Sequence, residues 1–391
     1  MEIKELISDK VRHLPGYIFS EFNKKKMILQ EQGMDVIDLG IGAPDLPTPQ
    51  FIIDVLTKEA QKPAHHRYSP YHGIKEFRIA VSEFYRKRYN VDLDPEDEVL
   101  MLIGSKEGIF HFLQTIINPG DGVLLPNPGY PVYRIATQLA QGKAFDLPLT
   151  VENNFIPDFS KITPEEKKRS KLILLNYPAN PTAATVDMEV FREAVQFARN
   201  HRIIVANDAA YDLMTFNDYV APSILQVPGA KEVAVEFGSL SKSFNMTGWR
   251  IGYVVGNKEI IQALAALKSN IDSAQFIPIQ KAASAALTSD LTTVQTNNLE
   301  FQSRMETMYD ILIQNGFKLE KPRGTFYLWV KVPDGYQSME FAEKLLTDTG
   351  VLVTPGNAFG TYGEGYFRIA LTVSRDRLYE AGKRLQKLKF S

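Results

Sequence analysis

The chain of 391 residues contains no cysteine. That absence excludes disulfide bonds, thiolate catalysis, and zinc or iron–sulfur sites ligated by cysteine. A strong charge bias is also missing, because 44 basic and 46 acidic side chains leave a formal net charge of −2. Without an overall positive field the chain has no general attraction to nucleic acid or to an anionic membrane, so we expect neither as a partner.

Long apolar runs are absent from the sequence as well. No uncharged run reaches the roughly 18 residues that a membrane-spanning helix needs, and the first residues carry mixed charge instead of the apolar stretch of a signal peptide. We therefore expect a cytoplasmic protein without a membrane anchor. His65, His66 and His72 lie close together, but no carboxylate or cysteine completes a plausible ligand set near them, so we expect no metal site.

The composition is that of an ordinary globular protein, with 44% hydrophobic and 23% charged residues. At about 150 residues per domain, the length suggests two or three domains. Between residues 50 and 285, short apolar runs alternate with longer amphipathic stretches. Runs that are apolar on both faces are typical of a parallel sheet covered by helices on both sides. We therefore predict a large α/β domain over residues 50–285.

The expected strands of this domain are residues 98–103, 122–125, 172–175, 203–206, 233–237 and 251–255, with helices over 109–117 and 191–198. The charged cluster at 165–169 is interpreted as a surface turn. After residue 290 the pattern indicates a smaller α+β unit over 286–391, with helices at 297–315 and 338–349 and strands at 324–330 and 366–371. Residues 1–49 form an N-terminal arm and part of this smaller unit, with a helix over 17–32.

The stretch SLSKSFNMTGWRIG, residues 239–252, combines groups that suit one kind of chemistry. Ser239, Ser241 and Arg250 could hold a phosphate beside the amine of Lys242, since hydroxyls and a guanidinium are good phosphate ligands. A lysine that is desolvated in such a place loses basicity and can form a Schiff base with a carbonyl compound. The stretch also follows one of the predicted strands.

This stretch resembles the lysine signature of the class I and II aminotransferases, which bind pyridoxal phosphate (PLP) on the fold-type I scaffold. The resemblance runs nearly from end to end of the chain. It implies a large domain with a mostly parallel seven-stranded sheet between helices, and a smaller α+β domain formed by both chain ends. It also implies ping-pong transamination of an L-amino acid with a 2-oxo acid, in which Lys242 carries the cofactor and moves the substrate proton.

Three more family landmarks fall after predicted strands. Asp208, 34 residues before Lys242, matches the aspartate that keeps the cofactor's pyridine nitrogen protonated, as an electron sink requires. Tyr211 matches the tyrosine that bonds the cofactor's 3′-oxygen, and Asn180 is expected to donate to the same oxygen and approach the substrate carboxylate. Ala183 stands where the family commonly has glycine, so a turn that needs positive φ would be strained there.

The phosphate end of the site is expected from two further places in the chain. Ser105 and Lys106 stand at the start of a predicted helix, where free N–H groups and the helix dipole favour an anion. Tyr130 matches the aromatic residue that stacks on the cofactor ring. Tyr68 matches a tyrosine that reaches the phosphate from a second subunit, so the resemblance implies a homodimer.

The substrate contacts implied by the resemblance come from both ends of the chain. Arg368, in the last predicted strand, would grip the substrate carboxylate with its guanidinium fork, and Gly42 would add a backbone donor. Tyr17 would lie over the substrate, and Asn270 would approach from the partner chain. Because Gly42 and Arg368 lie near opposite termini, the large domain is expected to be inserted in the small one.

Residues 14–19, 104–109 and 268–273 look like segments of the branch that contains the LL-diaminopimelate and alanine (glutamate–pyruvate) aminotransferases. The open donors are LL-diaminopimelate, alanine, aspartate and methionine, with 2-oxoglutarate or pyruvate as acceptor. A PLP-dependent C–S β-lyase on the same fold is the alternative activity. A PLP-binding regulator without enzymatic activity would need a DNA-binding module ahead of the fold, and the roughly 30 residues before the Gly40 segment contain no helix-turn-helix pattern.

Overall fold

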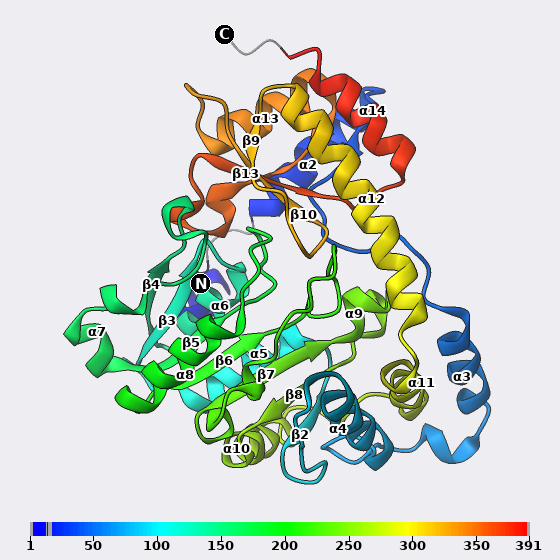
Figure 1. Ribbon diagram of the computed structural model, residues 1–391, viewed down its shortest axis with the longest axis vertical. Helices are drawn as coiled ribbons and strands as arrows, with labels where there is room; N and C mark the ends of the chain where they lie inside the picture. Colours follow the sequence, from blue (N-terminus) through cyan, green and yellow to red (C-terminus); the bar gives the residue numbers. More distant parts are fainter. Residues whose placement is uncertain (1–2, 13, 15–17, 389–391) are drawn as a thin grey trace.

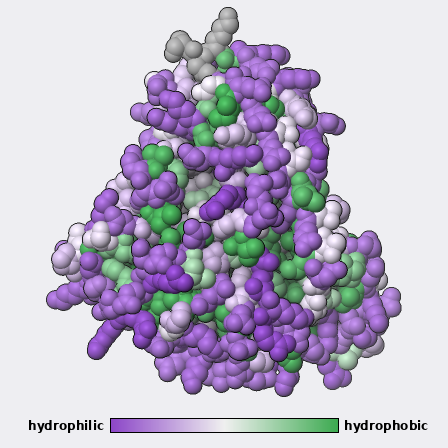
Figure 2. Space-filling view, viewed as in Figure 1, coloured by the Kyte–Doolittle hydropathy of each residue, from purple (hydrophilic) through white to green (hydrophobic). Residues whose placement is uncertain are grey.

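The computed structural model describes residues 3–12, 14 and 18–388. A large unit built on one wide sheet occupies the lower part of Figure 1, and a smaller unit that contains the C-terminal part of the chain, coloured orange to red, lies above it. In the part of the chain that the structure describes, no helix has an apolar stretch long enough to cross a membrane. The face of the molecule seen in Figure 2 is mostly hydrophilic, with separate hydrophobic patches.

The large sheet has seven strands in the order β2-β8-β7-β6-β5-β3-β4. Strand β8 runs antiparallel to both of its neighbours, while the other pairs are parallel, so the predicted mostly parallel seven-stranded sheet is confirmed. The bounds are β2 (Val99–Leu102), β3 (Gly122–Asn127), β4 (Lys143–Pro148), β5 (Ser170–Leu175), β6 (Ile204–Asp208), β7 (Ala234–Ser239) and β8 (Gly252–Gly256).

Helices cover both faces of this sheet because successive side chains of a strand point to opposite sides. In β2, for example, Met101 belongs to one core and Leu102 to the other. The first core receives α3 (Gln50–Ala60), α4 (Lys75–Tyr89), α8 (Met188–His201) and α11 (Ile277–Thr288), and the second receives α5 (Ser105–Ile116), α6 (Pro131–Leu139) and α10 (Lys258–Lys268). The sheet is therefore buried on both sides, as its apolar runs require.

The smaller unit is built from both chain ends around a third core, in which Phe22 and Leu39 share a cluster with Phe301 and Phe367. Its antiparallel sheet has the order β12-β13-β10-β9, and β1 pairs in parallel with β11. The bounds are α2 (Ile18–Glu31), β1 (Ile37–Asp38), α12 (Thr292–Gln314), β9 (Lys318–Leu319), β10 (Tyr327–Lys331), α13 (Ser338–Thr349), β11 (Val351–Leu352), β12 (Thr354–Pro355), β13 (Tyr366–Ala370) and α14 (Arg375–Leu385).

Several local predictions were wrong. The charged cluster at 165–169 is not a turn but part of a short helix, α7 (Pro164–Arg169), because Thr163 and Glu166 form a capping box around its start. The strand expected at 324–330 begins only at Tyr327, and the helix expected at 297–315 begins already at Thr292. Strand β4 was missed because its exposed edge positions are charged, which breaks the apolar run.

Candidate active site

A cleft of about 1070 Å³ lies where the carboxyl ends of β6 and β7 face the smaller unit. Ligands of open α/β sheets bind at this edge, outside the carboxyl ends of the strands. The residues expected at the site that line this cleft are Gly42, Ser105, Lys106, Tyr130, Asn180, Asp208, Tyr211, Ser239, Ser241, Lys242, Arg250 and Arg368. The fold therefore brings together residues that are far apart in the sequence.

Lys242 lies on α9 (Leu240–Ser243), one short turn after β7. Its Nζ donates to the carbonyl oxygen of Gly42 at 2.8 Å. Burial lowers the pKa of Lys242 to about 8, and the positive charges of Arg368 and Arg250 act in the same direction. A substantial fraction of the amine is therefore neutral near physiological pH, which a nucleophilic lysine needs.

Asp208 is the last residue of β6 and is buried. Its carboxylate accepts hydrogen bonds from the hydroxyl of Tyr133 at 2.7 Å and from the backbone N–H of Ala210 at 3.3 Å, both neutral donors. Burial raises the pKa of Asp208 to about 6, and the charge of Lys242 offsets only part of that effect. A buried carboxylate held by neutral donors fits a cationic group in the cleft, such as a protonated ring nitrogen.

Tyr211 makes a hydrogen bond with the hydroxyl of Tyr327 at 2.9 Å. Burial and the neighbouring Tyr327 raise the pKa of Tyr211 above its ordinary value, so its phenol stays protonated at physiological pH. The ring of Tyr327 lies 4.2 Å from the guanidinium carbon of Arg368. Tyr327 was not predicted, because the apolar pattern of its strand does not tell which residues face the cleft.

Arg368 is buried on β13, between β12 and β10. Its guanidinium donates to Oδ1 of Asn180 at 2.6 Å and to the carbonyl oxygen of Gly40 at 2.8 Å. The ring of Phe359 lies 4.7 Å from the same group, on which Tyr327 also packs. These contacts hold the fork in one orientation before any ligand arrives, which reduces the entropy that binding must remove.

Asn176, which the sequence reasoning missed, connects Asp208 to Asn180. The side chain of Asn176 donates to the carbonyl oxygen of Asp208 at 2.7 Å and accepts from the N–H of Asn180 at 2.8 Å. Ala183, just beyond Asn180, has φ of 56°, so the left-handed conformation expected at this position is present without a glycine. Asn176 was missed because an Asn after a strand has no signature of its own.

The start of α5 and the guanidinium of Arg250 form the other end of the cleft. Ser105 and Lys106 are the first two residues of this helix. A Cβ added at Gly104 would lie 2.4 Å from Nη2 of Arg250, so this glycine lets the guanidinium approach the helix start. Ser239 caps α9 by accepting from the N–H of Ser241 at 3.2 Å. N–H groups, hydroxyls and two cations at one end suit a phosphate.

Two expected site residues do not line the cleft of the single chain. The side chain of Tyr68 is 90% exposed, and that of Asn270 is exposed and donates to the carbonyl oxygen of Ala266. Both were expected to act on a partner's site, which a single chain does not test. Tyr17 lies outside the described residues.

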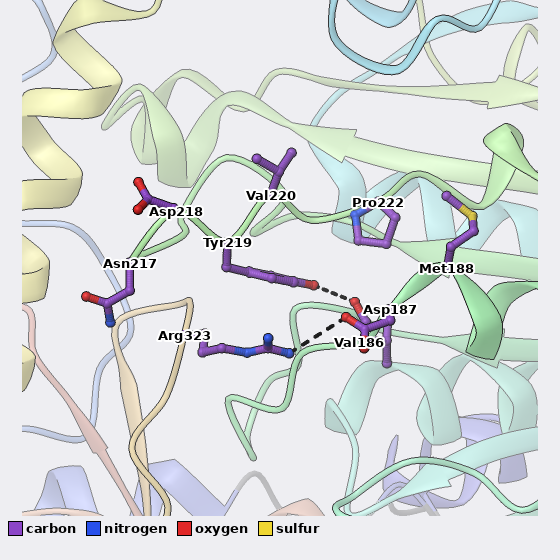
Figure 3. A pocket seen from close by; sticks show the side chains of 9 residues that line it. All are labelled: Val186, Asp187, Met188, Asn217, Asp218, Tyr219, Val220, Pro222 and Arg323. Carbon is purple, nitrogen blue, oxygen red and sulfur yellow. Dashed lines mark hydrogen bonds and ion pairs between the residues drawn. The ribbon is translucent and has the colours of Figure 1, made fainter.

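Two other places in the molecule have features of a site. Glu107, His111 and Asp272 are close enough to share an ion, but Nζ of the buried Lys268 lies 3.0 Å from Glu107 and 2.6 Å from Asp272 and already supplies the positive charge. Figure 3 shows a second hollow, of about 380 Å³, in which Arg323 packs on the ring of Tyr219. Its lining offers no lysine, histidine or cysteine, so it carries no comparable chemistry.

The family model "Aminotransferase class I and II" matches residues 34–385. The LL-diaminopimelate aminotransferase of Moorella thermoacetica is 49% identical over 379 residues, 97% of each chain, and that of Aquifex aeolicus is 48% identical over 98% of this chain and 99% of its own. The substrate-bound structure of BacF from Bacillus subtilis superposes with a TM-score of 0.95 at 36% identity, covering 99% of this chain and 98% of BacF.

The buried charge of Asp208 leads to a prediction about stability. The pKa of this carboxyl is raised in the folded state, so its ionisation removes stability from the wild type as pH rises from about 4 to about 6. In the cofactor-free protein, Asp208→Asn should therefore raise the free energy of unfolding by about 3 kcal/mol at pH 8, and by much less at pH 4. Urea unfolding at both pH values measures this, and equal stability of the two proteins at pH 8 would contradict it.

Proposed function

The chain belongs to the class I and II aminotransferases and depends on pyridoxal phosphate, and on that premise we propose that it moves an amino group from LL-diaminopimelate to 2-oxoglutarate. The donor is supported by eight relatives, 44–49% identical over nearly the whole chain, that are named LL-diaminopimelate aminotransferase. The observation that carries the proposal is that one cleft contains Lys242, whose pKa is lowered, together with the buried Asp208 and the guanidinium of Arg368.

The residues of the cleft divide into three tasks under this proposal. Ser105, Lys106, Ser239, Ser241 and Arg250 would hold the cofactor's phosphate, and Tyr130 would stack on its ring. Asn180 and Tyr211 would bond its 3′-oxygen. When bound, the cofactor supplies an electron sink for the negative charge that is left when the substrate loses its Cα proton. Its fit rests on the anion-binding end near Arg250 and on the neutral donors around Asp208.

The proton transfers fall to the chain's own side chains. Arg368 binds the carboxylate of the amino acid, with Asn180 and the backbone of Gly42 beside it, and so directs the Cα–H bond toward Lys242. The neutral amine of Lys242 takes the Cα proton as general base and later returns it. Asp208 would keep a proton on the ring nitrogen of the bound cofactor. Because the same Arg368 would bind the carboxylate of the 2-oxo acid, both half-reactions use one site in turn, as ping-pong kinetics require.

We also propose a homodimer and the domain limits expected from the sequence. Tyr68 and Asn270 are exposed in the single chain, as residues that complete a partner's site would be. Tyr17 would cover the substrate.

The shared core of Phe22, Leu39 and Phe367 supports a small domain made of residues 1–49 and 286–391 around a large domain of residues 50–285.

Replacing the amine tests the chemical step. Lys242→Ala should lower kcat for transamination by at least about 10⁴-fold, because it removes both the attachment to the cofactor and the base. Multiple turnover of amino acid and oxo acid is measured by product formation. The control Lys344→Ala removes a partly exposed lysine outside the cleft that pairs with Asp348, and it should retain full activity. Undiminished turnover of Lys242→Ala would contradict the proposed role.

A panel of substrates tests the donor and the acceptor. LL-diaminopimelate, alanine, aspartate and methionine are each paired with 2-oxoglutarate and with pyruvate. We expect kcat/KM for LL-diaminopimelate with 2-oxoglutarate to exceed that of the other pairs by about ten-fold or more, a difference of about 1.4 kcal/mol in transition-state binding. A higher value for alanine or aspartate would overturn the donor. Release of pyruvate and thiol from cystathionine without an acceptor would indicate the C–S lyase instead.

Mixed dimers test whether Tyr68 acts across the subunit interface. Co-expressed Lys242→Ala and Tyr68→Ala chains should regain about one quarter of wild-type activity, because half of the dimers are mixed and each contains one intact site. The control mixture of Lys242→Ala with Asp208→Ala should regain none, since both residues belong to the same chain's site. No recovery in the first mixture would contradict a shared site.

A further inference from the structure

The segment from Leu39 to Thr48 links the substrate-binding arginine to the lysine. Three consecutive carbonyl oxygens of this segment are each bound by a different side chain. Gly40 accepts from Arg368 at 2.8 Å, Ile41 accepts from Thr372 at 2.7 Å, and Gly42 accepts from Lys242 at 2.8 Å. A small displacement of this backbone would therefore move the partners of both functional side chains together.

The path of the segment leaves little room for movement at Gly42. A Cβ added there would lie 1.9 Å from the hydroxyl oxygen of Tyr327, so the backbone passes directly against that ring. Farther along, the side chain of Asn245 donates to the carbonyl oxygen of Pro47 at 3.1 Å, and its own carbonyl accepts from Thr48 at 2.8 Å. The segment is thus held at one end by the smaller unit and at the other by the loop that follows Lys242.

Between these two anchors, Asp45 forms an ion pair with Arg304 of α12. The distance from Nη1 of Arg304 to Oδ1 of Asp45 is 2.7 Å. Arg304 is only 3% exposed, and the same nitrogen donates to the carbonyl oxygen of Leu371 at 3.1 Å. Leu371 directly follows β13, the strand that carries Arg368. One buried guanidinium therefore ties the Gly42 segment to the end of the strand that presents Arg368.

We propose that Arg304 and Asp45 are positioning residues for transamination: their ion pair holds residues 40–46 in register with β13, so that Arg368 and Gly42 meet the substrate carboxylate. This inference rests on the proposed role of Arg368 in carboxylate binding. Neither Asp45 nor Arg304 lines the cleft, so the pair acts through the position of the backbone of residues 40–46. Neither residue has a part in the proton transfers.

A purely electrostatic role for Asp45 predicts the opposite result from a positioning role. Removing a negative charge near an anion-binding site strengthens anion binding. If Asp45 acted only through its charge, Asp45→Asn would lower KM for both carboxylate substrates. If Asp45 places the segment, the same variant weakens the pair with Arg304 and raises KM. The sign of the change therefore separates the two roles.

Glu300 provides a matched control within the same network. It accepts from Nε of Arg304 at 2.8 Å and also pairs with Arg375, but it lies on α12 and does not touch the Gly42 segment. Glu300→Gln removes one of the two negative charges that pair with Arg304, and Asp45→Asn removes the other. A general loss of rigidity would affect both variants, whereas the positioning role concerns only Asp45 and Arg304.

The experiment compares wild type, Asp45→Asn, Arg304→Lys, Glu300→Gln and Arg368→Lys as PLP-loaded enzymes. Steady-state kinetics with LL-diaminopimelate and 2-oxoglutarate give KM and kcat. Calorimetric titration with succinate, a dicarboxylate that cannot be transaminated, gives carboxylate affinity without turnover. We expect Asp45→Asn and Arg304→Lys to raise KM for both substrates and Kd for succinate by about ten-fold, with kcat changed by less than about three-fold. Glu300→Gln should lower Tm but leave KM and succinate Kd within about two-fold of wild type.

Three results would overturn the inference: an unchanged or lower succinate Kd for Asp45→Asn, an equal rise in Glu300→Gln, or a ten-fold weaker cofactor affinity in Asp45→Asn. The proposed function would fail differently, in the wild type itself, through absent turnover of LL-diaminopimelate with 2-oxoglutarate. If Arg368→Lys bound succinate as tightly as the wild type, the premise about Arg368 would be wrong, and the inference would fall with it.

Discussion

Asp208 is buried and Lys242 is partly buried at the carboxyl edge of one sheet, and desolvation disfavours the charged form of each. The pKa of the lysine falls to about 8 and that of the aspartate rises to about 6, so desolvation moves both groups toward neutral pH. This effect depends on excluding water, which the helices on both faces of the sheet and the smaller unit above the cleft provide. The buried charge of Asp208 lowers the free energy of unfolding of the cofactor-free protein. The group that the proposed function needs at this position is therefore one that destabilises the fold.

The two units contact each other at the same cleft. The smaller unit supplies Arg368, whose fork is held by Asn180 of the large unit and by Gly40 near the N-terminus. The amine of Lys242 binds the next part of that N-terminal segment, at Gly42. Because both functional side chains depend on one stretch of backbone, the ion pair between Asp45 and the buried Arg304 affects the site as well as the stability of the fold.

Much of the fold could be predicted from periodicity. The strands of the large sheet that are apolar on both faces were found, and helix α13 was predicted with its observed bounds, because buried strands and amphipathic helices have distinct patterns. Strand β4 was missed since an edge strand exposes charged side chains, and α7 was taken for a turn because short charged helices depend on their caps. Among cleft residues, Tyr133, Asn176 and Tyr327 were missed, because nothing in the local pattern shows that their side chains face the cleft.

The sequence by itself determined the class of architecture, the family and the types of side chain available at the site, because apolar periodicity and the spacing around Lys242 are local properties of the chain. Only the tertiary structure decided which of these groups meet and in which protonation state. The pKa shifts of Lys242 and Asp208 come from desolvation, and the fork of Arg368 is oriented by residues about 190 and 330 positions away. Burial and such distant contacts exist only once the two chain ends close over the sheet.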